Sequence, residues 1–315
     1  MSKNKNTILT KDPSLAAKAL EKGGIVLFPT ETVYGIGADS RNFDSCLEIY
    51  KIKNRPADNP LIVHLADPND IQKIAELPKN AEILLEKYMP GPLTLVLPKK
   101  DSKVFSAGLD TIAVRVPSHS LAREMIRLSG VPVSAPSANL SGRPSITRLE
   151  DAIHEFQGKV DVILDGQEPE IGLESTVIDL SGNSPKILRP GFLGPEELKE
   201  IFPNLSYTSY YPNEEEGIRP ASPGMKYRHY APDANVIFAE IGTLPKEDSA
   251  AIGIDLLEGW AFSLSVPDNL EYMKNLYSFF RDCDRMKIRT VYCFPPAEGQ
   301  GKEALLNRIR KAQDR

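Results

Sequence analysis

Cysteine and histidine are scarce in this chain of 315 residues, which has three cysteines and four histidines. No two cysteines form a Cys-x-x-Cys pair, and the four histidines are scattered along the sequence. An odd, sparse cysteine count is typical of a reducing compartment and argues against a disulfide framework. No group of His and Cys has the spacing of metal ligands, so we expect no metal held by protein side chains. Cys46 is expected to pack in a core.

Long apolar runs are also missing. None approaches the roughly 20 residues that span a membrane. Residues 1–11 are polar and lack the apolar stretch of a signal peptide, so we expect a cytoplasmic protein with no membrane contact. The net charge is −5, from 38 basic and 43 acidic residues. That balance argues against a protein built to coat nucleic acid, although it is compatible with a local basic groove.

Two common phosphate-binding signatures are absent. The chain has no Gly-x-x-x-x-Gly-Lys-Ser/Thr loop, and Ser40 stands where Gly35-Ile36-Gly37 would need a third glycine for the dinucleotide fingerprint. No ordering of Ser, His and Asp favours a catalytic triad. Any nucleotide is therefore held in another way, and catalysis by positioning and charge neutralisation is favoured over a covalent nucleophile.

What the chain does contain is a polar loop directly after a buried strand. Residues 25–28 are apolar, and Pro29 ends the strand because it cannot donate to a ladder. Residues 30–34 then supply two threonines, a glutamate and a tyrosine. Ligands of open α/β sheets bind at the carboxyl ends of strands. Gly35 and Gly37 would let the backbone turn tightly or approach a ligand.

Several cations follow later strands and helices. We expect a concave site in which four of them face an anion, namely Lys53, Arg55, Arg143 and Arg189. Arg115 lies inside the apolar strand 112–116, where a buried charge is costly unless it is paired. It therefore contacts either an acidic side chain or an anionic ligand. His64, in strand 61–66, is either a hydrogen-bonded core residue or a ligand contact.

The pattern of elements changes twice along the chain. Residues 1–202 alternate strands and helices, which predicts a twisted, mixed α/β sheet. Residues 203–234 are rich in Tyr, Pro and Glu without a helical or strand period, and we expect a linker that acts as a lid on the site. Residues 235–315 predict a smaller α/β unit, in which we see no catalytic constellation.

Four motifs resemble signatures of the Sua5/YrdC/YciO family, and specifically of its two-domain Sua5 type. They are Lys53-Asn54-Arg55, Ser137-Ala138-Asn139, residues 28–35 and residues 222–230. Many relatives carry glycine at the position of Asn54. The resemblance covers the whole chain, and it implies a YrdC-like catalytic domain over 1–202 and a Rossmann-like Sua5 C-terminal domain over 235–315.

The resemblance also implies an activity. The family's enzymes are nucleotidyltransferases that form threonylcarbamoyl-AMP and pyrophosphate from L-threonine, bicarbonate and ATP, for the modification of adenosine 37 in tRNA. Mg²⁺ would be bound through the phosphates, with no metal ligand from the protein. We expect a monomer that could pass its product to the tRNA threonylcarbamoyltransferase machinery and that contacts tRNA only weakly or indirectly.

The site residues that the resemblance implies are carried over position by position. The catalytic residues would be Lys53 and Arg55. L-threonine would be bound by Thr32, His64, Arg115, Ala135 (through its backbone) and Ser175. ATP would be bound by Arg55, Asn59, Thr111, Ser137, Asn139, Ser145, Arg189 and Tyr230.

Two other readings stay open. The first is a YrdC-like module that binds RNA or a nucleotide in its basic concavity without catalysis. The acidic net charge and the missing run of exposed aromatics weigh against it. The second is a carbamoyl-adenylate-handling domain, as in hydrogenase maturation proteins. The lack of zinc-like cysteine clusters and of an acylphosphatase-like N-terminus argues against it.

Overall fold

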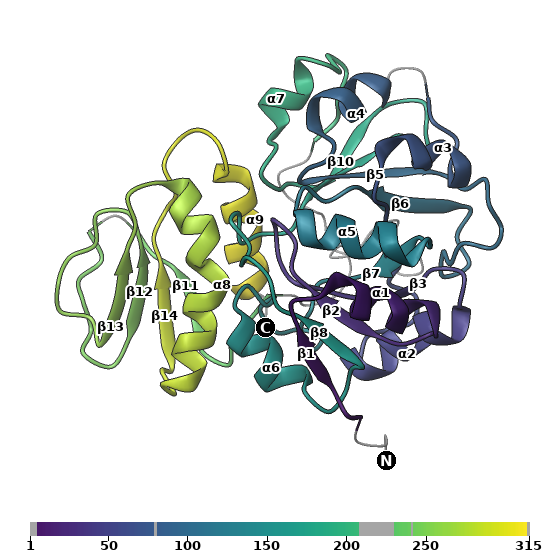
Figure 1. Ribbon diagram of the computed structural model, residues 1–315. Coiled ribbons are helices and arrows are strands. Elements are labelled where there is room, and N and C mark those ends of the chain that lie inside the picture. Colours follow the sequence, from purple (N-terminus) through teal and green to yellow (C-terminus); the bar gives the residue numbers. More distant parts are fainter. Residues whose placement is uncertain (1–4, 79–80, 208–229, 241, 314–315) are drawn as a thin grey trace.

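The computed structural model describes residues 5–78, 81–207, 230–240 and 242–313. Their strands form two sheets, each covered by helices (Figure 1). The larger sheet has ten strands in the order β1-β8-β2-β3-β7-β4-β6-β5-β9-β10, and the smaller has four in the order β11-β14-β12-β13. The expected fold class, a mixed α/β sheet followed by a smaller α/β unit, is confirmed. The domain boundaries at 202 and 234 stay a prediction.

The strands of the larger sheet are short. They are β1 (Ile8–Thr10), β2 (Val26–Phe28), β3 (Gly35–Asp39), β4 (Ile62–His64), β5 (Leu93–Pro98), β6 (Thr111–Arg115), β7 (Val133–Ala135), β8 (Val162–Leu164), β9 (Thr176–Asp179) and β10 (Lys186–Arg189). Its helices are α1 (Pro13–Glu21), α2 (Phe43–Lys53), η1 (Pro68–Asp70), α3 (Ile71–Ile74), α4 (Glu82–Tyr88), α5 (Ser120–Ser129), α6 (Leu149–Phe156) and α7 (Pro195–Lys199). The sheet is mixed, since β4 pairs with β6 in parallel and with β7 antiparallel.

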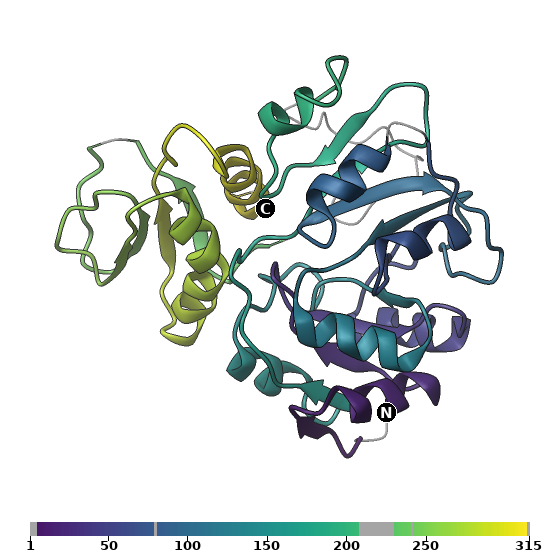
Figure 2. The ribbon, with the colours of Figure 1, turned by 45° about the horizontal axis from the view of Figure 1, so that its top comes forward.

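The smaller sheet is parallel throughout. Its elements are β11 (Asn235–Phe238), β12 (Ala250–Gly253), β13 (Phe262–Ser265), α8 (Asn269–Arg285), β14 (Thr290–Cys293) and α9 (Lys302–Gln313). Helices α8 and α9 lie between this sheet and the rest of the molecule in both ribbon views (Figures 1 and 2). Among the described residues, no helix has the length and apolar character needed to cross a membrane.

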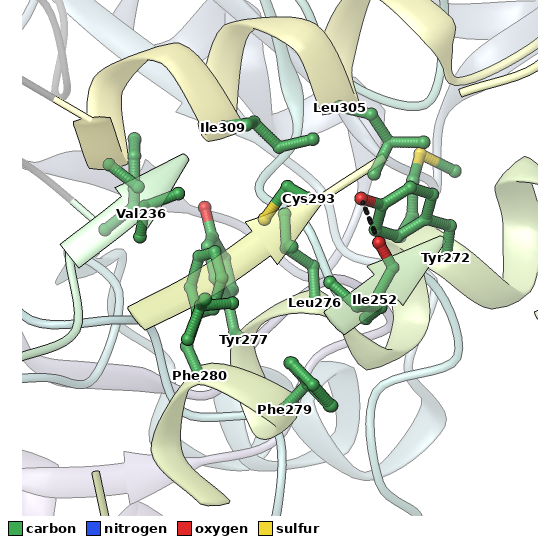
Figure 3. Close-up of a cluster of buried hydrophobic side chains, with 14 of the residues drawn as sticks. Val236, Ile252, Tyr272, Leu276, Tyr277, Phe279, Phe280, Cys293, Leu305 and Ile309 are labelled. Atoms are coloured by element: carbon green, nitrogen blue, oxygen red, sulfur yellow. Dashed lines mark hydrogen bonds between the residues drawn. The ribbon is translucent and has the colours of Figure 1, made fainter. Parts of the chain in front are cut away.

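One apolar core joins the two parts. Tyr272, Leu276, Phe280, Leu305 and Ile309 pack against the smaller sheet (Figure 3). The same cluster contains Val33 and Leu173 from the larger part. Ion pairs border it, including Arg281 with Glu155 at 2.9 Å and Arg148 with Asp282 at 3.0 Å. The C-terminal unit is thus packed onto the larger sheet over a continuous buried contact.

Local chemistry explains the start and end of α2. The side chain of Asn42 accepts a hydrogen bond from the Ser45 amide, as an N-cap does. At the other end Asn54 adopts a left-handed conformation, with φ of 50°. Asparagine and glycine are the residues that tolerate this conformation best, so Asn54 fits this position. After this turn, the Arg55 side chain lies against the residues that follow it in the chain.

One of the two roles expected for Gly35 and Gly37, a tight turn, is wrong. Gly35 and Gly37 belong to β3, which pairs antiparallel with β2. A Cβ added at Gly35 would lie 2.9 Å from Phe28 Cζ, and one at Gly37 would lie 2.7 Å from Val133 Cγ1. The two glycines therefore make room for neighbouring side chains and do not form a turn.

One further point differs from expectation, and one agrees with it. The strands β1 and β13 were not predicted, because each is only three or four residues long and lies at a sheet edge with half-exposed side chains. Helix α5 is capped by His119, whose side chain accepts from the Ala122 amide. Cys46 is fully buried in a core cluster, as expected.

Candidate functional site

A cavity lies where several strand ends of the larger sheet come together. The strands β4, β6 and β10 end in His64, Arg115 and Arg189, and Ser175 immediately precedes β9. The lining residues are Thr30, Val33, Tyr34, Gly35, Lys53, Arg55, Ile62, His64, Arg115, Ala135, Pro136, Ser137, Asn139, Ser141, Glu174, Ser175, Arg189 and Tyr230. The cavity is thus built at strand ends, where ligands of α/β sheets bind.

Most of the predicted site residues meet in this cavity. The ten that line it are Lys53, Arg55, His64, Arg115, Ala135, Ser137, Asn139, Ser175, Arg189 and Tyr230. Three others lie directly behind the lining. Thr32 shares a hydrogen bond of 2.9 Å with Thr30, the Asn59 carbonyl accepts from Arg55, and Ser145 donates to Glu174. Thr111, at the start of β6, is half-buried and is not among the lining residues.

Arg143 is a correction. It was expected to face the anion, but it is not among the lining residues. Its guanidinium lies 3.4 Å from Asp233 and 3.7 Å from Asp284, and its side chain is 45% exposed. One carboxylate before β11 and one from α8 hold it at the surface, and no pattern in the local sequence predicts that pairing.

Arg115 contacts an acidic side chain, one of the two alternatives left open by the sequence. Its Nη2 lies 2.8 Å from Glu31 Oε1, and both residues are buried. Nε and Nη2 of Arg115 and both carboxylate oxygens of Glu31 lack a hydrogen-bond partner of good geometry in the described part of the chain. Buried polar atoms are normally paired. The guanidinium therefore keeps donors for a further carboxylate.

His64 stands beside Arg115 in the sheet register. Its Nδ1 is 3.0 Å from the Ile62 carbonyl, and its ring packs edge-on against Phe28. Burial, and then the neighbouring Arg115 charge, lowers the pKa of His64 to about 3. The imidazole is therefore neutral at physiological pH, and the positive charge at this end of the cavity comes from Arg115.

Lys53 brings two motifs of the sequence together. Its ammonium is almost fully buried and donates to the carbonyls of Ser137, at 2.7 Å, and of Asn139. Burial, and then the charge of Arg55, lowers the pKa of Lys53 well below its usual value. The end of α2 is thereby tied to the Ser137–Asn139 loop, 84 residues away.

Two more guanidiniums line the cavity. Arg55 donates to the Asn59 carbonyl at 3.2 Å and to the Pro60 carbonyl at 3.0 Å. Burial lowers the pKa of Arg55 to about 10, which leaves it protonated at neutral pH. Arg189 donates to the backbone carbonyl and the hydroxyl of Ser175. These two arginines bring two guanidiniums to this part of the cavity, which makes it suited to an anion.

The site also contains residues that sequence reasoning missed. Glu174 lines the cavity and pairs with Arg308 of α9 at 2.9 Å. Burial opposes ionisation of Glu174, but the charges of Arg308 and Arg189 outweigh it and lower the pKa of that carboxyl. The sequence feature that could have identified this pair is a charge on an apolar helix face, because Arg308 lies beside the buried Leu305 and Ile309.

The predicted lid is only partly visible. Residues 208–229 lie outside the described residues, so the structure does not test that role. Tyr230, the last residue of the motif, is buried and lines the cavity. Its ring stacks on Tyr277, with centroids 5.5 Å apart.

Comparison with known proteins identifies two family regions. A model of the Sua5/YciO/YrdC family, described as telomere recombination, matches residues 18–191. A model described as the C-terminal domain of threonylcarbamoyl-AMP synthase matches residues 194–313. Together the two models cover nearly all of the chain.

Full-length relatives show the same arrangement. The threonylcarbamoyl-AMP synthase of Pyrococcus abyssi is 39% identical over 320 residues, which cover 95% of this chain and 93% of the relative. That of Bacillus subtilis is 37% identical over 330 residues, covering 96% and 94%. The crystal structure of P. abyssi Sua5 complexed with L-threonine superposes with a TM-score of 0.89 and is 36% identical, covering 98% of this chain and 97% of that one.

The fold and the cationic cavity define a two-part α/β enzyme of the nucleotidyltransferase type. The chain belongs to the Sua5/YrdC/YciO family, and it carries both parts of the two-domain Sua5 type.

Proposed function

We propose that the chain forms threonylcarbamoyl-AMP and pyrophosphate from L-threonine, bicarbonate and ATP in the cavity described above. The observation that carries the proposal is that three guanidiniums, those of Arg55, Arg115 and Arg189, line one cavity. Those of Arg115 and Arg189 are buried. Such a set suits an amino-acid carboxylate and a triphosphate side by side. The similarity to full-length threonylcarbamoyl-AMP synthases and to a threonine-bound Sua5 supports it.

Arg115 is the proposed partner of the threonine carboxylate. Its buried Nε and Nη2 lack well-aligned acceptors, and a carboxylate can accept both in a bidentate pair. Glu31 balances the charge of Arg115 when no ligand is bound. The neutral His64 beside Arg115 adds no competing positive charge. This end of the cavity is therefore selective for a molecule that carries one carboxylate.

The reaction then follows from proximity. The threonine amine attacks bicarbonate and water is lost, which gives a carbamate. A carbamate oxygen attacks the α-phosphorus of ATP, the bond to the bridging oxygen breaks, and pyrophosphate leaves. Arg55 and Arg189 would stabilise the charge that develops on the phosphates, while Lys53 holds the Ser137–Asn139 loop beside them.

Mg²⁺ is proposed to enter with the triphosphate, where it neutralises phosphate charge. The donor set of the cavity fits this, because Glu174, the carboxylate among the described lining residues, already binds Arg308, Tyr277 and Ser145. No group of three His, Cys, Asp or Glu side chains in the described residues could hold the ion instead. Transfer of the product toward tRNA and a monomeric state stay predictions.

A pyrophosphate-release assay tests the proposal. Purified protein receives ATP, Mg²⁺ and bicarbonate, with or without L-threonine, and the nucleotide product is identified by mass spectrometry. We expect pyrophosphate only when threonine is present, together with a mass equal to threonylcarbamoyl-AMP. Salt-dependent binding of RNA, with no threonine-dependent pyrophosphate, would instead favour the non-catalytic module.

A further inference from the structure

The C-terminal helix α9 inserts an arginine into the wall of the cavity. Arg308 is 0% exposed. Its Nε donates to Glu174 at 2.9 Å, and its Nη1 donates to the Pro190 carbonyl at 3.0 Å. Glu174 adjoins Ser175 and Pro190 adjoins Arg189 in the chain. One guanidinium thus holds two segments that carry residues of the cavity.

The same guanidinium covers a third segment. It lies 5.1 Å from the ring centroid of Tyr230, within cation–π distance. Tyr230 also stacks on Tyr277 of α8, whose hydroxyl donates to Glu174 at 3.0 Å. The backbone of Tyr230 has φ of 70°, which a bulky residue adopts only when its surroundings hold it there. Arg308 and Tyr277 supply those surroundings.

A second arginine repeats the pattern. Arg281 of α8 donates to Glu155 at 2.9 Å and to the Pro144 carbonyl at 2.5 Å. Pro144 precedes Ser145, whose hydroxyl donates to Glu174. Both arginines therefore join a carboxylate to the carbonyl next to a residue predicted to bind ATP. This is more than a generic interface needs, because burying an ion pair costs desolvation that apolar packing avoids.

We propose that Arg308 is a positioning residue for the nucleotide side of the cavity: it fixes Arg189, through Pro190, and the ring of Tyr230 in the geometry that receives ATP. The C-terminal unit thereby supports the residues of the nucleotide site without lining the cavity through Arg308 itself. The proposal rests on the proposed function, since it takes ATP to lie beside Arg189 and Tyr230. Arg308 has no contact with Arg115 or His64 at the threonine end among the interactions described above. Of the residues named for threonine, Ser175 adjoins one partner of Arg308, Glu174.

The test is Arg308→Lys in the full-length protein. Lysine keeps a positive charge beside Glu174 but loses the planar fork that reaches Pro190 and covers Tyr230. Calorimetric titration with Mg·ATP should show an affinity about tenfold weaker, while the affinity for L-threonine changes less than about twofold. The matched control is Arg148→Lys, because Arg148 pairs with Asp282 across the same interface and is not a lining residue. That control should bind both ligands like the wild type.

Circular dichroism melting separates positioning from folding. A variant that melts earlier but binds ATP like the wild type would show that Arg308 only stabilises the interface, which overturns the proposal. Equal losses for ATP and threonine would overturn it as well. If Arg308→Lys does not fold, Tyr277→Phe decides, because it removes one hydroxyl from Glu174 and keeps the stacked ring. A selective loss of ATP affinity supports the proposal, and unchanged affinity overturns it.

A wild-type protein that binds no ATP would overturn the proposed function, and this inference with it. That result is read on the unmutated chain. It is therefore distinct from a failure that appears only in the variants.

Discussion

Arg115 and Glu31 form the central pair at the scale of single residues. Each is buried, each retains polar atoms without a well-aligned partner, and their charges cancel when no ligand is present. A buried pair of this kind contributes little net stability, but breaking it by removing one partner is strongly destabilising. Its geometry is therefore better explained by ligand binding than by folding.

The first prediction concerns threonine binding. Arg115→Gln, made together with Glu31→Gln so that no buried charge is left alone, should weaken L-threonine binding by about 30-fold or more, because a charged hydrogen-bonded contact is lost. ATP binding should change by less than about threefold, since Arg55 and Arg189 remain. Calorimetry measures both. Arg143→Gln is the control outside the cavity, and equal losses for the two ligands would remove Arg115 from the threonine site.

The second prediction concerns acid stability. The pKa of His64 is lowered to about 3 in the folded state, from an ordinary value of 6.5. Between those values the unfolded chain binds the extra proton, so this contribution is fully present above pH 6.5 and falls as the pH drops toward 3. The slope should be about 1 kcal/mol per pH unit. Urea unfolding between pH 7 and 5 should therefore be less steeply pH-dependent in His64→Asn than in the wild type.

Exposed His154 supplies the control for that experiment. His154→Asn should keep the wild-type pH dependence. A wild-type protein whose stability is flat from pH 7 to 5 would show that His64 is not held neutral by burial and Arg115.

At the scale of elements, the glycines of β3 show how packing overrides a local pattern. A Gly-x-Gly after a proline reads as a turn in sequence. In the structure the two glycines form a strand, because Phe28 and Val133 occupy the space where side chains would be. The loop that delivers Thr30 and Tyr34 to the cavity is held between β2 and this strand.

The third prediction tests that packing. Gly37→Ala places a Cβ 2.7 Å from Val133 Cγ1 and 2.9 Å from the ring of Phe28. Overpacking of this kind should lower the free energy of unfolding by about 1–3 kcal/mol. Gly182→Ala, where nothing lies within 4 Å of the added atom, should change it by less than about 0.5 kcal/mol. Urea denaturation compares the two, and equal effects would contradict the packing account.

Elements with a strong local sequence pattern could be predicted from the sequence, whereas the distant residues that they contact in the fold could not. The apolar run around Val63 and the charge of Arg115 inside another apolar run indicated two buried strands, and both are found. The contact between Glu174 and Arg308 joins residues 134 positions apart, and no local period encodes it. For the same reason, the sequence indicated a cationic site but not that its wall includes the C-terminal helices.

At the scale of the whole molecule, the two parts share one continuous apolar core. We therefore expect each part to shield buried residues of the other from solvent. All three cysteines are free and buried, one in the larger part and two in the C-terminal unit. Burial raises the pKa of Cys46 to about 12 and raises the pKa values of Cys283 and Cys293 further. The thiolate is the reactive form, so all three should be inert in the native state.

The fourth prediction follows from this. In native buffer, Ellman's reagent should modify none of the three thiols over the time in which urea-unfolded protein reacts fully. The rates should rise together across the unfolding transition. A thiol of the C-terminal unit that reacts well before Cys46 would show that this unit opens independently, which contradicts a single shared core.

The most direct measurement is a crystal structure with L-threonine and a non-hydrolysable ATP analogue bound together. The account predicts the amino acid's carboxylate on the Arg115 guanidinium and the triphosphate beside Arg55 and Arg189. The threonine nitrogen and the α-phosphorus should be close enough for one carboxyl group to bridge them. Electron density that places the two ligands in separate sites, or the triphosphate away from both arginines, would contradict it.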